Sequence, residues 1–134
     1  MDSFTNAIWL ILVIASSVVS IVGSILSGEL GLRLYALLSP FLWAFNVTFM
    51  LTWADDFNMK VLALSVWQLI VHIIISPYIG KRAILVSSSS LVITMSLNQW
   101  GSDAFEVAAF TACVEVATWI ISYFLLTLRS RILR

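Results

Sequence analysis

The chain has 134 residues, of which 61% are hydrophobic and only 10% are charged. Soluble domains carry about 25% charged residues, and a chain this short cannot bury so much apolar surface in a water-soluble core, so soluble globular and disordered proteins are both excluded. Seven basic and seven acidic residues cancel, which leaves no electrostatic footprint for binding nucleic acid.

Charged residues divide the chain into five long segments that are almost free of charge. Each segment has the roughly 20 residues that a helix needs to cross about 30 Å of hydrocarbon, and backbone groups in lipid must be hydrogen-bonded within their own segment. We therefore predict an all-α fold, a polytopic transmembrane helical bundle that forms a single domain over residues 1–134. The predicted spans cover residues 4–27, 33–54, 59–80, 83–101 and 104–128.

The first span carries small residues four positions apart, at Ser16, Ser20, Ser24 and Gly28. Small side chains at this spacing let two helix backbones approach closely, either within the chain or between two copies of it. Gly28 also stands where a glycine commonly follows the end of a helix. Glu29 precedes Arg33 by four residues, a spacing that favours an ion pair on a helix surface.

The second and third spans each combine a proline with a polar residue. Pro40 removes a hydrogen bond from the second span and favours a kink, and Asn46 follows it. The third span contains His72, and Pro77 and Gly80 are expected to end it.

The loop between these two spans contains the adjacent carboxylates Asp55 and Asp56. Such a pair can attract a cation. The interpretation that we favour is that they cap the next helix and hold the loop in water.

The fourth span is the weakest of the five because it contains four consecutive serines, residues 87–90. These side chains cannot all face one way on a helix. Some of their hydroxyls must therefore bond to carbonyls one turn earlier, line a wet cavity or meet a neighbouring helix. A re-entrant segment here, which would leave four true spans, is the alternative.

The fifth span opens with Asp103 and Glu106, whose spacing resembles a capping box. Ala108 and Ala112 belong to a row of small residues that suits helix packing or an oligomer interface. Glu115 lies about ten residues from the outer end of this span, near the centre of the bilayer at ~1.5 Å per residue.

The distribution of basic residues predicts the orientation, because these residues gather at the cytoplasmic ends of spans. With five spans and the N-terminus outside, six of the seven basic residues lie on the cytoplasmic side, all except Lys60. An even number of spans would put both termini on one side and spoil this pattern. We therefore expect a multi-pass protein of a cytoplasmic (inner or plasma) membrane, with its C-terminus inside.

Three polar residues, Asn46, His72 and Glu115, lie deep within the predicted spans. A carboxylate at mid-membrane costs at least about 2.5–3.5 kcal/mol on insertion scales, so Glu115 should not face lipid while it is ionised. It can pair with His72, the only histidine of the chain. Three interpretations stay open: a proton or cation path or a substrate-coupling site, a structural clamp between helices, or a contact with another subunit.

Chemical motifs offer no sign of catalysis. The sequence has no HExxH, GxSxG, P-loop or GxGxxG pattern, and one histidine cannot supply a bis-histidine haem site. The single cysteine excludes a disulfide framework within the chain and a zinc cluster. We expect no enzymatic activity, no metal and no cofactor.

The function that we predict is that of a small membrane protein that works as a homo-oligomer or with another membrane protein in the lipid bilayer. Its most specific activity would be a holin-like or channel-like path for protons or small ions through Glu115 and His72. A lone five-helix bundle has little interior for a carboxylate, an imidazole and a row of serines, so we expect several copies to supply it. The alternative is a non-conducting accessory, immunity or exclusion subunit that binds another membrane protein.

Overall fold

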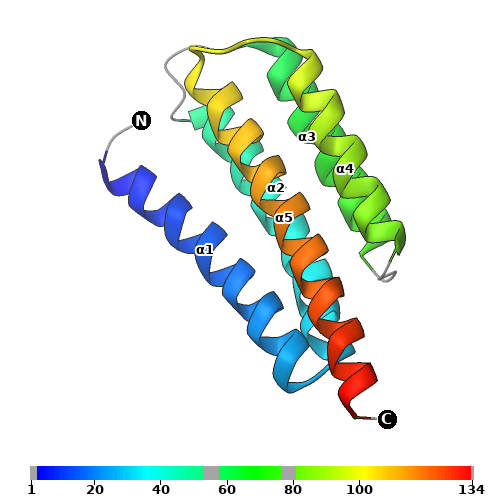
Figure 1. Ribbon diagram of the computed structural model, residues 1–134. Helices are drawn as coiled ribbons and strands as arrows, with labels where there is room; N and C mark the ends of the chain where they lie inside the picture. Colours follow the sequence, from blue (N-terminus) through cyan, green and yellow to red (C-terminus); the bar gives the residue numbers. More distant parts are fainter. Residues whose placement is uncertain (1–2, 53–57, 77–80, 134) are drawn as a thin grey trace.

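The computed structural model describes residues 3–52, 58–76 and 81–133, with the side chains of residues 3–6 left aside. The described residues form five helices and no strand, which confirms the all-α prediction (Figure 1). The helices are α1 (Ser3–Leu26), α2 (Glu29–Thr52), α3 (Met59–Ile75), α4 (Lys81–Ser96) and α5 (Asp103–Ile132).

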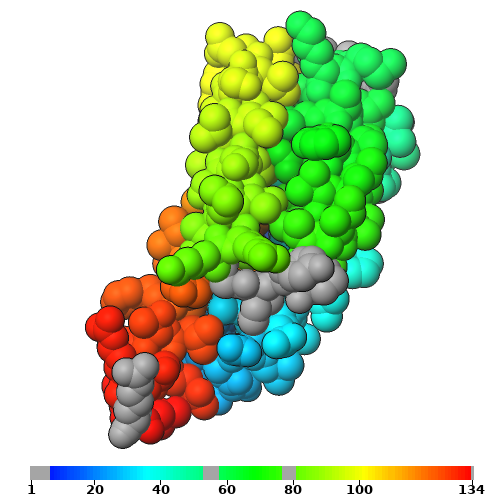
Figure 2. Space-filling model, turned by 90° about the vertical axis from the view of Figure 1, so that its right-hand side faces the viewer, coloured from blue at the N-terminus to red at the C-terminus, as the bar shows by residue number. Residues whose placement is uncertain are grey.

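Helix α5 occupies the centre of the bundle and contacts all four of the other helices. Helices α1 and α2 form one antiparallel hairpin, and α3 and α4 lie together on the other side (Figure 1). The α1–α2 turn and the C-terminus mark the lower end of the bundle in Figure 1, and the junction of α4 with α5 marks its upper end. Figure 2 shows that α3 and α4 cover only the upper part, so the last turns of α5 extend beyond them.

The α1–α2 hairpin is closed by glycines. Gly28 adopts a φ of 65°, in the left-handed region, as expected for the glycine after the first helix. A Cβ atom on Gly31 would lie 2.3 Å from the backbone nitrogen of Ser24 and 2.4 Å from the carbonyl carbon of Gly23. The two backbones therefore meet at a distance that only glycine permits. Of the other predicted helix breakers, Pro77 and Gly80 lie outside the described residues, and α2 continues through Pro40.

The two ends of the α4–α5 connection differ from the prediction. Helix α4 stops at Ser96 instead of residue 101, because a turn follows in which Asn98 and Gly101 have φ values of 51° and 100°. Ser102, and not Asp103, is the N-cap residue of α5, and its side chain makes no capping hydrogen bond. Asp103 and Glu106 lie instead in the first turn, where their charge suits the positive end of the helix dipole.

Three of the helices are long and apolar enough to cross a membrane: Ala7–Leu26, Glu29–Thr52 and Asp103–Ile132. Helix α3 is apolar but has 17 residues, and α4 has 16. Large apolar side chains point outward from all five helices, including Phe41 (70% exposed), Ile74 (65%) and Leu85 (68%). Serine, threonine and other polar side chains fill much of the interior. Together with the three long apolar helices, these outward apolar side chains suggest a membrane protein.

Candidate functional site: a histidine–glutamate pair inside the bundle

The candidate site is a buried contact between α3 and α5. His72 Nε2 lies 2.5 Å from Glu115 Oε1, although the two residues are 43 positions apart in the sequence. His72 is 3% exposed and Glu115 is 0% exposed. Among the described residues, Glu115 is the one Asp, Glu, Lys or Arg that is buried. The structure thus brings together two of the three deep polar residues singled out in the sequence.

Helix α2 supplies the partners of the second carboxylate oxygen. Ser39 Oγ and Trp43 Nε1 each donate a hydrogen bond to Glu115 Oε2, both at 3.0 Å. The two donors are four residues apart and therefore lie on one face of the helix. Hydrogen bonds to both oxygens offset much of the desolvation cost that a buried carboxylate carries.

The other nitrogen of His72 determines how many protons the pair holds. Nδ1 lies 2.6 Å from the backbone carbonyl oxygen of Gln68. A carbonyl oxygen only accepts hydrogen bonds, so Nδ1 must carry a hydrogen. One further proton then lies between Nε2 and Oε1, on either atom. The pair is neutral overall in both arrangements, as a neutral imidazole with a carboxylic acid or as an imidazolium with a carboxylate.

Aromatic rings and a small cavity surround the pair. The rings of Trp43 and His72 lie 5.7 Å apart, and the Tyr35 and Trp119 rings make an edge contact at 5.0 Å on the lower side. A cavity of about 10 Å³ touches His72 and Ser39. Its lining consists of Ala36, Ser39, His72, Ile75, Ser76, Ala83 and Trp119. That volume is near the lower limit for one water molecule.

Asn46, the third deep polar residue, does not touch the pair. It lies on the same face of α2 as Ser39 and Trp43, and neither atom of its amide has a hydrogen-bond partner among the described residues. The same holds for Gln68 Nε2. Inside a protein, such groups are usually satisfied by protein or by ordered water.

The small residues predicted to pack helices are used within the single chain. Ser20 Oγ lies 2.7 Å from Ser122 Oγ of α5, and Ser24 Oγ donates to the Ser20 carbonyl at 2.7 Å. Ser16 donates to carbonyls of its own helix. Gly28 lies against the Arg129 side chain. On the other side of α5, the Ala108 and Ala112 side chains pack with Trp43.

Comparison of the chain with family models, with curated proteins and with solved structures gives no match. The part of the chain that the structure describes contains no group of three or more His, Cys, Asp and Glu side chains that could hold a metal ion. Asp55 and Asp56 lie outside that part. One imidazole and one carboxylate, each with fixed partners, form a site that holds a proton.

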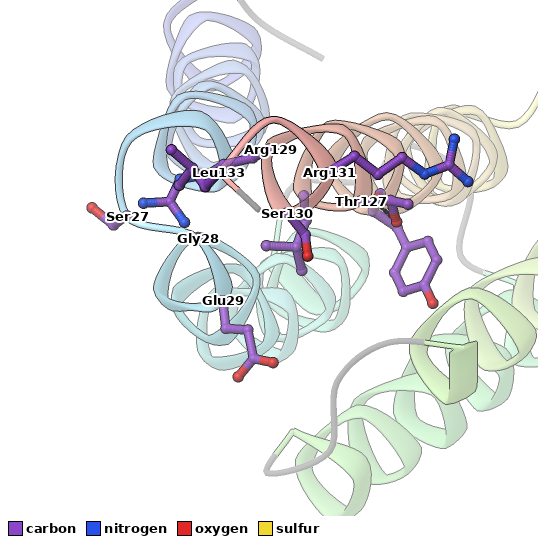
Figure 3. A pocket seen from close by; sticks show the side chains of 10 residues that line it. Ser27, Gly28, Glu29, Thr127, Arg129, Ser130, Arg131 and Leu133 are labelled. Atoms are coloured by element: carbon purple, nitrogen blue, oxygen red, sulfur yellow. Dashed lines mark hydrogen bonds between the residues drawn. The ribbon is translucent and has the colours of Figure 1, made fainter.

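A second hollow of about 750 Å³ lies at the lower end of the bundle, between the α1–α2 turn and the end of α5 (Figure 3). Figure 3 shows Arg129 reaching toward Gly28, whereas Arg131 extends away from it. Arg129 Nε donates to the Ile25 carbonyl at 3.0 Å and thereby caps the end of α1. Glu29 pairs with Arg33 at 3.6 Å, as the spacing predicted. Among the charged groups of this open hollow, Arg129 thus links the end of α5 to the end of α1.

Three residues of the site were missed in the sequence: Ser39, Trp43 and Gln68. Gln68 stands four residues before His72, and Trp43 stands three residues before Asn46, so helical spacing from these two predicted residues could have found both. Ser39 lies one further turn from Trp43. Their roles depend on the rotation of α2 against α5, which the sequence pattern leaves open.

Proposed function

We propose that this chain is an integral membrane protein in which the His72–Glu115 pair is the obligatory step of a path for protons or small ions. The observation that carries the proposal is the fully buried carboxylate, bonded on both oxygens and paired with the only histidine. Replacing a buried ion pair by apolar residues of similar volume is often neutral or stabilising. Packing alone therefore gives little reason for this arrangement, whereas ionisable groups inside a membrane commonly mark a transport path.

Membrane insertion of all five helices best accounts for the surface. The outward apolar side chains on α3 and α4, such as Ile74 and Leu85, are as unfavourable in water as those on the longer helices, so lipid is the environment that suits them. The 17 residues of α3 span about 26 Å, close to the hydrocarbon thickness, and modest mismatch is absorbed by bilayer thinning. Lys81 and Arg82, at the start of α4, would then meet the cytoplasmic head groups, as five spans with the N-terminus outside require.

The path lies within one chain. A shared interior between several copies was expected to shelter Glu115, yet a single chain encloses it completely, at 0% exposure. Ser20 and Ser24, offered as an oligomer face, contact α5 or their own helix. We therefore place the conducting unit in each chain and make assembly, with further copies or with a membrane partner, a separate proposal.

Ion flux into liposomes that contain the purified protein tests this function. Glu115→Gln keeps the shape of the side chain but removes its ionisable group, and we expect flux to fall about 100-fold, the effect of roughly 2.7 kcal/mol on the barrier. Glu29→Gln is the matched control, because Glu29 is 64% exposed and pairs only with Arg33 at the surface. Its flux should stay at the wild-type level.

Retention of flux in Glu115→Gln would show that the pair is a structural clamp. Absence of flux in the wild-type protein would favour the alternative, a non-conducting subunit that binds another membrane protein. The mass of the detergent-solubilised particle, resolved into copies and any additional chain, then separates a homo-oligomer from a complex with a partner.

A further inference from the structure

Building on the proposed path, we infer that the species it carries is the proton and that hydrated metal cations are excluded. Two features flank the His72–Glu115 pair on opposite sides. A row of buried polar groups without partners lies toward the upper end of the bundle, and the small cavity lies on the other side of the pair. The inference rests on the proposed function, and its test separates the two.

The upper row comes from three helices. Its members are at most 3% exposed, and at least one polar atom of each has no partner among the described residues: Asn46, Gln68, Ser87 and Ser90. Asn46 lies two turns above Ser39, about 10 Å along α2. Gln68 lies one turn above His72 on the same face of α3.

Ala83 of α4 lines the small cavity together with His72, which shows that these two residues lie at about the same height in the bundle. Ser87 and Ser90 follow on the same face, one and two turns further up, at about 6 and 10 Å. The unpartnered groups of α2, α3 and α4 therefore occupy the same stretch of the bundle, directly above the pair. Buried polar groups find a partner in protein or ordered water, and the described residues supply none here, so water is the partner that we infer. We assign to it a file of water molecules.

The lower side is much narrower. The cavity beneath the pair has about 10 Å³, room for about one water molecule, and Ser39 lies between that space and Glu115. Metal cations in proteins keep a shell of several oxygen ligands. That shell does not fit here, whereas a proton passes along a chain of hydroxyls and one water without any ion moving through.

The transfer balances in protons alone. With the shared proton on His72 Nε2, a proton that arrives through the water file binds the Glu115 carboxylate and gives the pair one positive charge. Ser39 then turns its hydroxyl hydrogen from Oε2 toward the cavity. The proton on Oε2 passes to Ser39 Oγ while the original hydroxyl proton passes to the cavity water, which leaves Ser39 donating to Oε2 again. The pair returns to its starting state, and no bond other than O–H is made or broken.

Selectivity is measured with liposomes that contain the full-length protein and a pH-sensitive dye, with potassium and valinomycin setting the voltage. Parallel vesicles carry dyes for sodium and potassium, without valinomycin. We expect proton flux in the first set and none above protein-free vesicles in the others. Flux of sodium or potassium that Glu115→Gln abolishes would overturn the proton assignment and leave the proposed function standing. Absence of every flux in the wild-type protein would overturn both.

Variants of α4 test the water file. Ser90→Val fills the row and removes a hydroxyl, and we expect proton flux at least about tenfold lower. Ser89→Val is its matched control, because Ser89 is exposed and its hydroxyl bonds only to the Leu85 carbonyl of its own helix. Flux should be unchanged there. Equal flux in the two variants would overturn the water file.

Ser39→Ala tests the lower side with a smaller change, one that keeps the helix and removes the hydroxyl between Glu115 and the cavity. We expect proton flux to fall by about tenfold. The elution volume and the helix content of the variant should match those of the wild-type protein, which shows that it is folded. This variant also keeps the inference testable if Ser90→Val does not fold. Wild-type flux in Ser39→Ala would overturn the assigned route.

Discussion

The serines of α1 and those of α4 look alike in the sequence but have opposite surroundings. On α1, Ser24 and Ser16 donate to carbonyls of their own helix, and Ser20 bonds to Ser122 of α5. On α4, the hydroxyls of Ser87 and Ser90 are as deeply buried and have no partner among the described residues. Both rows consist of small residues at helical spacing, and only their hydrogen bonds distinguish them.

Under the proposed function, this difference separates serines that pack helices from serines that line the proton path. A buried hydroxyl with a partner lets two helices approach closely at little cost, as along the α1–α5 contact. A buried hydroxyl without one costs about 1–3 kcal/mol unless water or a ligand satisfies it. The α4 row lies beside the His72–Glu115 pair, and the α1 row does not. The serines of the α1–α5 contact thus have partners, whereas Ser87 and Ser90, which we assign to the candidate path, have none among the described residues.

The largest expected effect comes from removing a partner inside the site. His72→Leu leaves Glu115 Oε1 without its imidazole partner, and breaking a buried pair from one side costs about 3–5 kcal/mol of the free energy of unfolding. Chemical denaturation in detergent, followed by tryptophan fluorescence, measures this loss.

The double variant His72→Leu/Glu115→Leu is the control for that measurement. Because it removes both polar groups, it should regain most of the lost stability while remaining inactive. If His72→Leu is as stable as the wild-type protein, the buried Glu115 carboxylate does not depend on His72 as a partner. The claim that this pair is a stabilising contact would then be wrong.

A smaller effect is expected on the structural side, where α1 crosses α2. In Gly31→Ala the new Cβ would meet backbone atoms of Gly23 and Ser24 at 2.4 and 2.3 Å, so the hairpin must open. Overpacking of this kind costs about 1–3 kcal/mol, partly offset by the better helix propensity of alanine. Thermal unfolding in detergent measures the change. Proton flux per folded molecule should stay unchanged, and a selective loss of flux would show that this hairpin belongs to the path.

The elements of the fold were predictable to different extents. Runs of uncharged residues located all five helices, and Gly28 marked the end of the first because a left-handed turn favours glycine. The fourth helix was predicted to run to residue 101, but α4 ends at Ser96. The prediction was wrong because the turn that follows carries no charge, so a charge-free run does not distinguish it from helix. Its local signals were Asn98 and Gly101, both residues that tolerate positive φ.

His72 and Glu115 were identified by their depth in the predicted spans. The flanking charges and the length of a span indicate how far each residue lies from its ends. Rotation of one helix against another is not encoded in the same pattern. Neither Trp43 nor Ser39 was singled out in the sequence, yet both donate to Glu115. The premise that one chain has too little interior to shelter Glu115 was wrong for the same reason, since the interior that encloses Glu115 arises from the relative rotation of α2, α3 and α5. Assembly itself stays a prediction.

The smallest expected effect bears most directly on the comparison of the two serine rows. Ser20→Ala removes a hydrogen bond to Ser122 and should cost about 1 kcal/mol of the free energy of unfolding. Ser90→Ala removes a hydroxyl that has no protein partner, so stability should be unchanged or should rise slightly. Equilibrium unfolding of both variants in the same detergent gives the two values. If Ser90→Ala is the more destabilised, its hydroxyl has a strong partner in the folded protein, and the α4 row is as structural as the α1 row.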